Sequence, residues 1–240
     1  MIGPMTADVM MSLDCSGAAA LAVLPMSAGG TLPREEQELA RAMAPERQHE
    51  FTIGRLAAHG ALAAVGGPAT AVLIGAAGEP LWPTAWVGSI SHSRHHAAAL
   101  VVSKRRVRSV GLDIVDERAL DDRAAANLMT VPEVKRLIDA GWARDAESAR
   151  RLVFSAKEAV FKCQYPLTGC ASLDFLDVTL CRTRDAAGAD RITASCPAWA
   201  QGEPPVMIEV FLRVLQGVVL ALAVARADGE GRLLFGQDRL

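Results

Sequence analysis

Two lysines and a glutamate stand together at residues 157–162, in a chain that contains only four lysines. On a helix, Glu158 and Lys162 are four residues apart and share one face. Alone, such a pair is typical of an exposed helix surface and contributes about 0.3–0.5 kcal/mol. With Lys157 beside them, the same residue types suit the binding of a phosphate ester together with a divalent metal ion.

A lone carboxylate, Asp113, lies within the apolar segment 110–115, whose alternation predicts a strand. Burying a carboxylate without a cation or hydrogen-bond donors is costly, so Asp113 either reaches solvent at a strand end or binds a cation. Mg²⁺ fits the second case, because it prefers oxygen ligands and often needs only one or two carboxylates plus substrate phosphates. Asp113 and Glu158 are 45 residues apart, so only the fold can bring them together.

Residues that could bind an anion occur earlier in the chain, at positions 89–93. This segment is rich in serine and contains His92. Small hydroxyl residues let backbone amides approach an anion, and the histidine can donate to a phosphate. His95 and His96 follow, but no cysteine or carboxylate stands at a spacing suited to a zinc site.

Arg47 and Arg55 fall eight residues apart on one expected helix, and therefore about 80° apart around its axis. Both could reach a single anionic group. As an isolated pattern, they fit two solvated arginines on a helix surface equally well.

The segments that must position these residues alternate between helical and strand-like patterns. Proline at a first helical turn loses no hydrogen bond, so Pro33 and Pro45 predict helix starts, and Thr130 with Glu133 matches a capping box. Expected helices cover residues 34–43, 46–65, 131–141 and 146–163, the last ending at Tyr165-Pro166. Expected strands cover residues 21–24, 87–93, 97–102 and 110–115, and a hairpin covers residues 206–225 around Gln216-Gly217. Helices and strands in both halves indicate an α+β fold.

Composition narrows the class of protein. With 240 residues, 51% of them hydrophobic and 22% charged, the chain can bury a sizeable core and is not expected to be disordered. A formal net charge of −2 and a sequence pI near 6.2 argue against a general nucleic-acid binder. Five cysteines without a C-x-x-C pair favour neither a disulfide framework nor a zinc site, which fits a reducing cytoplasm. The N-terminal segment lacks a signal-peptide pattern, and the longest apolar run, residues 218–225, is too short to span a bilayer.

Taken in chain order, these segments resemble the 4′-phosphopantetheinyl transferases of the surfactin- and enterobactin-synthetase type. The resemblance rests on Arg47 and on FTIGRLAA (51–58), GEPLWP (78–83), GSISHS (88–93), VGLDI (110–114) and FSAKEAVFK (154–162). PLWP and GSISH are most similar to the enterobactin branch. The resemblance implies two similar α/β halves related by a pseudo-twofold axis, residues 1–108 and 109–240. It places the metal-binding motifs in the second half and the active site in the cleft between the halves.

The resemblance also implies an activity. Such an enzyme, a holo-[acyl-carrier-protein] synthase, moves 4′-phosphopantetheine from coenzyme A to a serine of an apo acyl or peptidyl carrier protein. It requires Mg²⁺ and releases adenosine 3′,5′-bisphosphate. The enterobactin-like segments favour carriers of nonribosomal peptide, siderophore or polyketide assembly. We expect a monomer on which the carrier docks at exposed apolar residues near 120–131.

In the second half, Asp113 and Glu158 resemble the metal-binding carboxylates of this family, and we expect them to meet across the groove between the halves. Lys157 and Lys162 resemble contacts to the diphosphate of coenzyme A. Glu158 is the nearest candidate for the base that deprotonates the carrier serine. Catalysis is therefore expected to depend on Glu158 and Lys162.

In the first half, Arg47, Arg55 and His92 resemble contacts to the phosphates of coenzyme A, the 3′-phosphate in particular. Ser91 resembles the serine that precedes this histidine in the family. The loop that contains Glu79-Pro80 lies where the adenine is usually held.

One position departs from the family pattern Gly-x-Asp-x-Glu, because Val115 stands where the glutamate is expected and Asp116 follows it. On a regular strand, Asp113 and Val115 face the same side and Asp116 faces the other. Asp116 can therefore act as a third metal ligand only at a bulge or a strand end. Otherwise water completes the coordination.

Two other functions fit the same residues. A magnesium-dependent phosphohydrolase acting on a nucleotide would use the same carboxylates and cations. A coenzyme A-binding protein without catalytic activity is compatible with Val115 in place of the usual glutamate.

Overall fold

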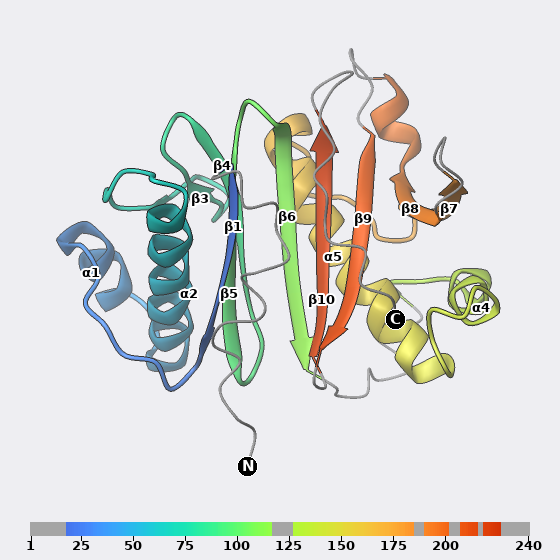
Figure 1. Cartoon of the computed structure of the whole chain (residues 1–240), viewed down its shortest axis with the longest axis horizontal. Coiled ribbons are helices and arrows are strands. Elements are labelled where there is room, and N and C mark those ends of the chain that lie inside the picture. Colours follow the sequence, from blue (N-terminus) through green and yellow to red (C-terminus); the bar gives the residue numbers. More distant parts are fainter. Residues whose placement is uncertain (1–17, 117–126, 185–189, 202–206, 216–217, 227–240) are drawn as a thin grey trace. The chain divides into compact units, whose positions relative to one another are not determined.

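The computed structural model describes residues 18–116, 127–184, 190–201, 207–215 and 218–226. Along the chain these residues form two compact units, which divide between Arg108 and Ser109. Each unit combines helices with a β-sheet (Figure 1). The α+β class expected from the sequence is thus confirmed, whereas the expected pseudo-twofold relation between the halves stays a prediction. No helix within the described residues has the length and apolar character needed to cross a membrane.

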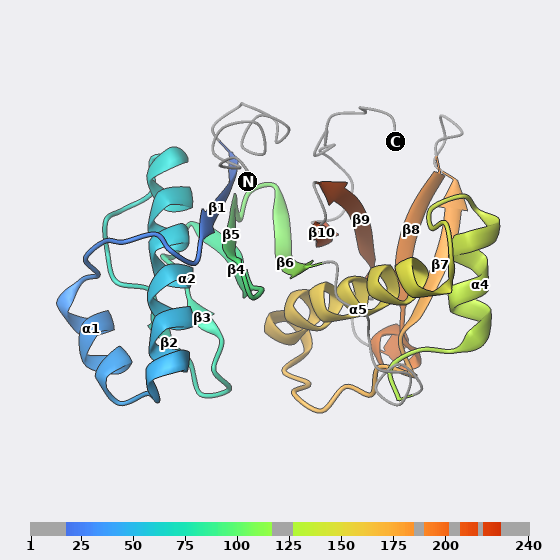
Figure 2. The same cartoon turned by 90° about the horizontal axis from the view of Figure 1, so that it is seen from below.

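The first unit is a three-stranded antiparallel sheet covered by a helix. β1 (Ala19–Pro25) and β4 (Trp86–His92) flank the central strand β5 (His96–Ser103). α2 (Pro45–Ala64) packs on this sheet and separates it from α1 (Arg34–Arg41), as Figures 1 and 2 show. A ribbon of β2 (Leu73–Ile74) and β3 (Pro80–Leu81) follows α2 in the chain.

Small residues allow α2 to lie close to the sheet. Ala57, Ala58 and Ala61 are fully buried in the apolar cluster between the helix, β1 and β5. A Cβ on Gly54 would come within 3.0 Å of the Ile90 side chain on β4. Because α2 fits so tightly against β4, residues of the helix can reach side chains at the end of that strand.

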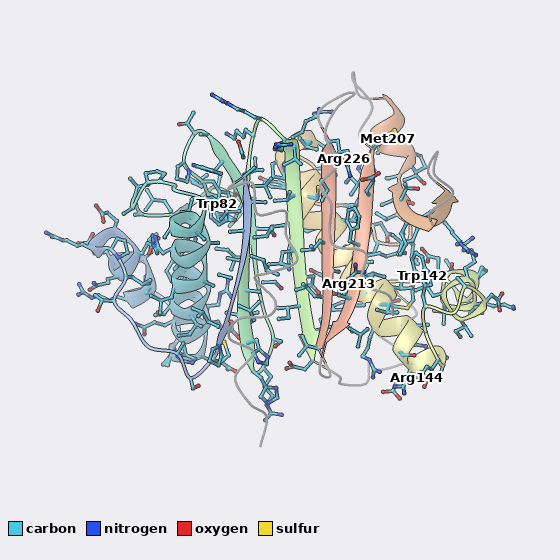
Figure 3. All side chains as sticks on the ribbon, viewed as in Figure 1. Trp82, Trp142, Arg144, Met207, Arg213 and Arg226 are labelled. Atoms are coloured by element: carbon cyan, nitrogen blue, oxygen red, sulfur yellow. The ribbon has the colours of Figure 1, made fainter. Side chains whose placement is uncertain are left out.

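The second unit is a five-stranded sheet in the order β6-β10-β9-β8-β7. Its strands are β6 (Val107–Asp116), β7 (Thr179–Arg184), β8 (Asp190–Ser195), β9 (Ile208–Leu215) and β10 (Val218–Arg226), with a 3₁₀ helix at Pro197–Gln201. α5 (Ala146–Thr168) packs on β10 and β9, and α4 (Val131–Asp139) packs against α5 (Figure 2). Arg226 of β10 donates to Glu209 of β9 at 2.8 Å, and Figure 3 marks Arg226 and Arg213 on these neighbouring strands.

β6 approaches α5 so closely that no side chain fits between them at Gly111. A Cβ there would lie 1.8 Å from the backbone oxygen of Ala159. Because alternate residues of a strand share a face, Asp113 is directed toward the same helix. Val115 packs against the core cluster that contains α5 residues, as this alternation requires.

The expected elements agree with the structure except at one helix end. The capping box of Thr130 and Glu133 opens α4, and β9 with β10 forms the expected antiparallel pair. Gln216-Gly217, residues 1–17 and most of the docking segment expected near 120–131 lie outside the described residues.

The expected helix end at Tyr165-Pro166 is wrong, because α5 continues through Pro166 to Thr168. The proline removes only one backbone donor. The last turn is held by Gly169, which adopts φ 67° and donates to the Tyr165 oxygen at 2.8 Å. The buried Gln164 side chain also accepts from the Thr168 hydroxyl and donates to the oxygen of Cys170.

Candidate active site

In the second unit, α5 presents a row of polar side chains to β6. Ser155, Glu158 and Lys162 are three and four residues apart and therefore share one face of the helix. Ser155 Oγ donates to Asp113 Oδ2 at 2.8 Å, and Lys162 Nζ donates to Asp113 Oδ1 at 2.8 Å. The fold thus brings Ser155 and Lys162, two turns apart on α5, to one carboxylate on β6.

Asp113 is buried, with 5% of its surface exposed, and the two donors offset the cost of that burial. Lys162 Nζ also donates to the backbone oxygen of Leu112 at 3.1 Å. The Lys162 side chain is 26% exposed, so it extends from solvent to the buried carboxylate. Lys162 therefore does more than form the exposed Glu-Lys pair of an ordinary surface helix.

Glu158 lies between Ser155 and Lys162 on this face of α5 and is partly buried. Burial raises the pKa of its carboxyl above the usual range, the charge of Lys162 opposes that shift, and the charge of Asp113 adds to it. Glu158 and Asp113 are thus close enough for their charges to interact. A cation shared by both carboxylates would offset this repulsion.

The two carboxylates at this site fit Mg²⁺, because they offer the hard oxygen ligands that this ion prefers. Among the described residues, no group of three or more histidine, cysteine, aspartate or glutamate side chains is placed so that it could hold a metal ion. Asp116, the last residue of β6, therefore does not complete such a group with Asp113 and Glu158, and its role as a third ligand stays a prediction. Asp113 and Glu158 both belong to the second unit, so the expectation that they meet across a groove between the halves is wrong.

Lys157 does not lie with these residues, although it precedes Glu158 in the chain. Its side chain is fully buried, and Nζ donates to the oxygens of Leu128 (3.0 Å) and Phe175 (2.7 Å). Nζ also lies 3.0 Å from the buried carboxylate of Glu133, and burial lowers the pKa of Lys157 while Glu133 opposes that shift. The three protons of this ammonium group thus have partners inside the protein, so this geometry does not support the predicted contact with the diphosphate.

In the first unit, Arg47 of α2 meets His92 at the end of β4. Arg47 Nη1 lies 3.0 Å from His92 Nε2 and 3.0 Å from Glu50 Oε2. His92 Nε2 is also 3.4 Å from the same Glu50 oxygen. A guanidinium can only donate, so His92 Nε2 accepts in its contact with Arg47. The two predicted phosphate contacts are thus neighbours, and the Arg47 guanidinium lies between His92 and the partly exposed carboxylate of Glu50.

Arg55 is buried, with 6% of its surface exposed. Its guanidinium lies 4.5 Å above the ring of Phe51 and donates to the oxygen of Leu73 at 3.3 Å. Burial lowers the pKa of Arg55 to about 10, which still leaves it charged near neutral pH. Its Nε has no hydrogen-bond partner among the described residues, so a bound anion would satisfy a buried donor.

Glu36 is a buried charged residue that sequence reasoning missed. It is fully buried, accepts from the backbone nitrogen of Val72 at 2.7 Å, and lies 2.9 Å from His59 Nε2. Its charge raises the pKa of Arg55 and so opposes the effect of burial. Nothing in the spacing of Glu36 along the chain predicts that it is a buried partner of His59 and Arg55, because these residues come from a different helix.

The remaining predicted binding residues lie on β4 and in the ribbon. Ser91 is buried in β4, immediately before His92. Glu79 Oε2 accepts from the backbone nitrogen of Ala77 at 2.9 Å, within its own loop, and Pro80 begins β3. Trp82, labelled in Figure 3, follows this ribbon and packs against Gly88 of β4. Contact of Glu79-Pro80 with adenine stays a prediction.

Comparison with known families identifies the class of protein. Residues 35–102 match the 4′-phosphopantetheinyl transferase N-terminal domain, and residues 109–208 match the 4′-phosphopantetheinyl transferase superfamily. The chain therefore belongs to the 4′-phosphopantetheinyl transferases, which confirms the resemblance drawn from its motifs.

Individual relatives agree with this assignment. The chain is 33% identical over 220 residues to 4′-phosphopantetheinyl transferase Svp of Streptomyces mobaraensis, covering 86% of this chain and 87% of Svp. It is 37% identical over 191 residues to enterobactin synthase component D of Salmonella typhi, covering 78% and 76%. It is 35% identical over 139 residues to 4′-phosphopantetheinyl transferase Npt of Nocardia iowensis, covering 57% and 60%.

Proposed function

We propose that this protein transfers 4′-phosphopantetheine from coenzyme A to a serine of an apo carrier protein, with Mg²⁺, and releases adenosine 3′,5′-bisphosphate. Membership of the transferase family supports the substrate class. The chemical proposal rests on one observation in the second unit: Lys162 of α5 bonds to Asp113 of β6, and Glu158 of α5 lies beside them.

The transfer exchanges one phosphorus–oxygen bond for another. The carrier serine oxygen bonds to the phosphorus that bears pantetheine, and the bond from that phosphorus to the bridging oxygen breaks. The electron pair leaves with adenosine 3′,5′-bisphosphate, and the serine proton must be accepted by a base. Because little covalent chemistry falls to the protein, positioning and charge stabilisation supply most of the rate.

Glu158 is the residue we assign as base. Its pKa is raised by burial, which brings the carboxylate closer to the strength that suits a base near neutral pH. Lys162 offers an ammonium group next to it, suited to offset negative charge on the diphosphate oxygens. Asp113 and Glu158 would hold Mg²⁺, which when bound offsets the charge of those same oxygens.

The first unit supplies the groups that we assign to the rest of coenzyme A. Arg47 and His92 would bind the 3′-phosphate, as would Arg55, whose buried Nε lacks a partner among the described residues. We assign Ser91 and the Glu79-Pro80 loop to supporting contacts, the loop toward adenine. Charge-assisted bonds from arginine to phosphate are among the strongest that such a site can offer.

The carrier and the cellular setting belong to the same proposal. Similarity to enterobactin synthase component D supports a carrier of nonribosomal peptide, siderophore or polyketide assembly. We propose that the protein acts as a cytoplasmic monomer, with its two halves at residues 1–108 and 109–240.

Intact mass of an apo carrier protein after incubation with coenzyme A, Mg²⁺ and this protein tests the proposal. We expect the carrier to gain one phosphopantetheine, and Glu158→Ala and Lys162→Ala to reduce the rate by orders of magnitude. Lys135→Ala is the matched control, because Lys135 is exposed on α4 and pairs with Asp139 of its own helix. Coenzyme A consumed without a heavier carrier would instead indicate a phosphohydrolase, and binding without turnover a non-catalytic protein.

A further inference from the structure

Ser155 lies in the middle of α5, and its hydroxyl faces β6. It is fully buried. In a helix interior, a serine hydroxyl commonly bonds to the backbone oxygen four residues earlier. Here Ser155 Oγ donates to Asp113 Oδ2 at 2.8 Å, so it links α5 to β6.

The two oxygens of Asp113 have different surroundings. Oδ2 is bonded to a neutral hydroxyl on the buried side, whereas Oδ1 is bonded to Lys162, whose side chain is 26% exposed. Rotation about the last bond of an aspartate is broad in energy, so neighbouring groups decide where each oxygen points. A fixed bond at Oδ2 therefore determines that Oδ1 is the oxygen presented on the side of Lys162.

We propose that Ser155 is a positioning residue, which orients Asp113 so that Oδ1 faces the side of Lys162, where a divalent cation would bind. This inference rests on the proposed use of Asp113 as a metal ligand. Ser155 itself touches neither the cation nor the substrate. Close packing at Gly111 supports the same geometry, because it fixes β6 against α5 two residues before Asp113.

Groups that orient a metal ligand usually change metal affinity about 10–100-fold when they are removed. We therefore expect Ser155→Ala to weaken the binding of the cation at least tenfold. Ser155→Cys keeps nearly the same volume but exchanges a strong donor for a weak one, and should weaken binding in the same direction. Ser155→Thr keeps the hydroxyl and should restore affinity.

Direct binding of Mn²⁺ to the full chain, measured by electron paramagnetic resonance without substrate, tests the proposal. Ser109→Ala is the matched control, because Ser109 is also buried on β6 but its hydroxyl bonds to the Cys163 thiol. We expect this control to bind Mn²⁺ within twofold of the unchanged protein. Unfolding temperatures of all variants identify any that fail to fold, in which case Ser155→Cys replaces Ser155→Ala.

Asp113→Asn separates this proposal from the proposed function. If Asp113→Asn loses Mn²⁺ binding but folded Ser155→Ala or Ser155→Cys binds normally, the positioning role is wrong and the metal site stands. If Asp113→Asn binds Mn²⁺ normally, the metal site itself is wrong, and the role of Ser155 falls with it. Loss of affinity in the Ser155 variants, with recovery in Ser155→Thr, supports the proposal.

Discussion

Lys157→Met is the change that most sharply separates a buried structural lysine from a substrate contact. Methionine retains an unbranched apolar side chain but removes the ammonium group. That group is bonded to the oxygens of Leu128 and Phe175 and paired with Glu133, which is itself 4% exposed. The substitution therefore leaves a buried carboxylate without its cation.

Breaking a buried ion pair by removing one partner costs about 3–5 kcal/mol. Glu133 keeps two donors from Thr130, its backbone nitrogen at 2.8 Å and its hydroxyl at 3.1 Å, so the lower end applies. We expect Lys157→Met to lower the free energy of unfolding by about 3 kcal/mol. At roughly 2–4 °C per kcal/mol for a chain of this size, the unfolding temperature should fall by about 6–12 °C.

A double-mutant cycle measures this coupling. Replacing both charged groups, as in Lys157→Met with Glu133→Leu, removes the uncompensated charge and should recover at least half of the lost stability. Binding of coenzyme A to the folded variants is then measured by calorimetric titration. For Lys157→Met we expect a Kd within about threefold of that of the unchanged protein, because the Lys157 ammonium group has its hydrogen-bond partners inside the protein. Lys162→Met serves as the contrast and should weaken binding more than tenfold. The reasoning is refuted if Lys157→Met unfolds normally yet weakens coenzyme A binding as much as Lys162→Met.

Three further changes test separate parts of the structure. Because burial raises the pKa of Glu158, its ionisation opposes folding, so stability should fall as the pH rises above the ordinary value of 4.5. In EDTA, Glu158→Gln should raise the unfolding temperature at pH 7 and lose that advantage below about pH 4; an equal gain at both pH values would contradict this. Gly111→Ala places a Cβ 1.8 Å from a backbone oxygen and should lower the free energy of unfolding, measured in urea, by about 3 kcal/mol, or prevent folding. Gly60→Ala is the control, because its Cβ makes an ordinary contact at 3.7 Å, and it should be neutral or stabilising by up to about 1 kcal/mol. Similar losses of stability in Gly111→Ala and Gly60→Ala would refute the close packing of β6 on α5. Arg47→Ala should raise KM about tenfold for coenzyme A but little for 3′-dephospho-coenzyme A, whereas equal effects on both would remove the 3′-phosphate assignment.

Much of the site could be predicted because its residues break local patterns. Asp113 is conspicuous in an apolar strand, where the cost of an isolated carboxylate predicts either solvent at a strand end or a cation. The structure supplies the ammonium group of Lys162. The helix that carries Glu158 and Lys162 is long and regular, so their shared face was also predictable.

The differences from the expected site come from tertiary contacts that chain position does not reveal. Lys157 stands next to Glu158 in sequence, but one residue of helix turns it by about 100° toward Glu133 and the Phe175 turn. Glu133 was predictable as a helix cap and not as an ion-pair partner. Ser155 carried a usable signal, since it shares the spacing of Glu158 and Lys162, whereas Glu36 carried none.

The most direct test of the central claim is the rate at which purified protein modifies an apo carrier when Asp113 and Glu158 are both made neutral. Asp113→Asn with Glu158→Gln retains the size of both side chains, and circular dichroism can verify that the variant is folded. We predict that the unchanged protein adds one phosphopantetheine to the carrier serine in the presence of coenzyme A and Mg²⁺, while the folded double variant adds none in the same time. A double variant that modifies the carrier at a comparable rate would show that this pair of carboxylates does not perform the transfer.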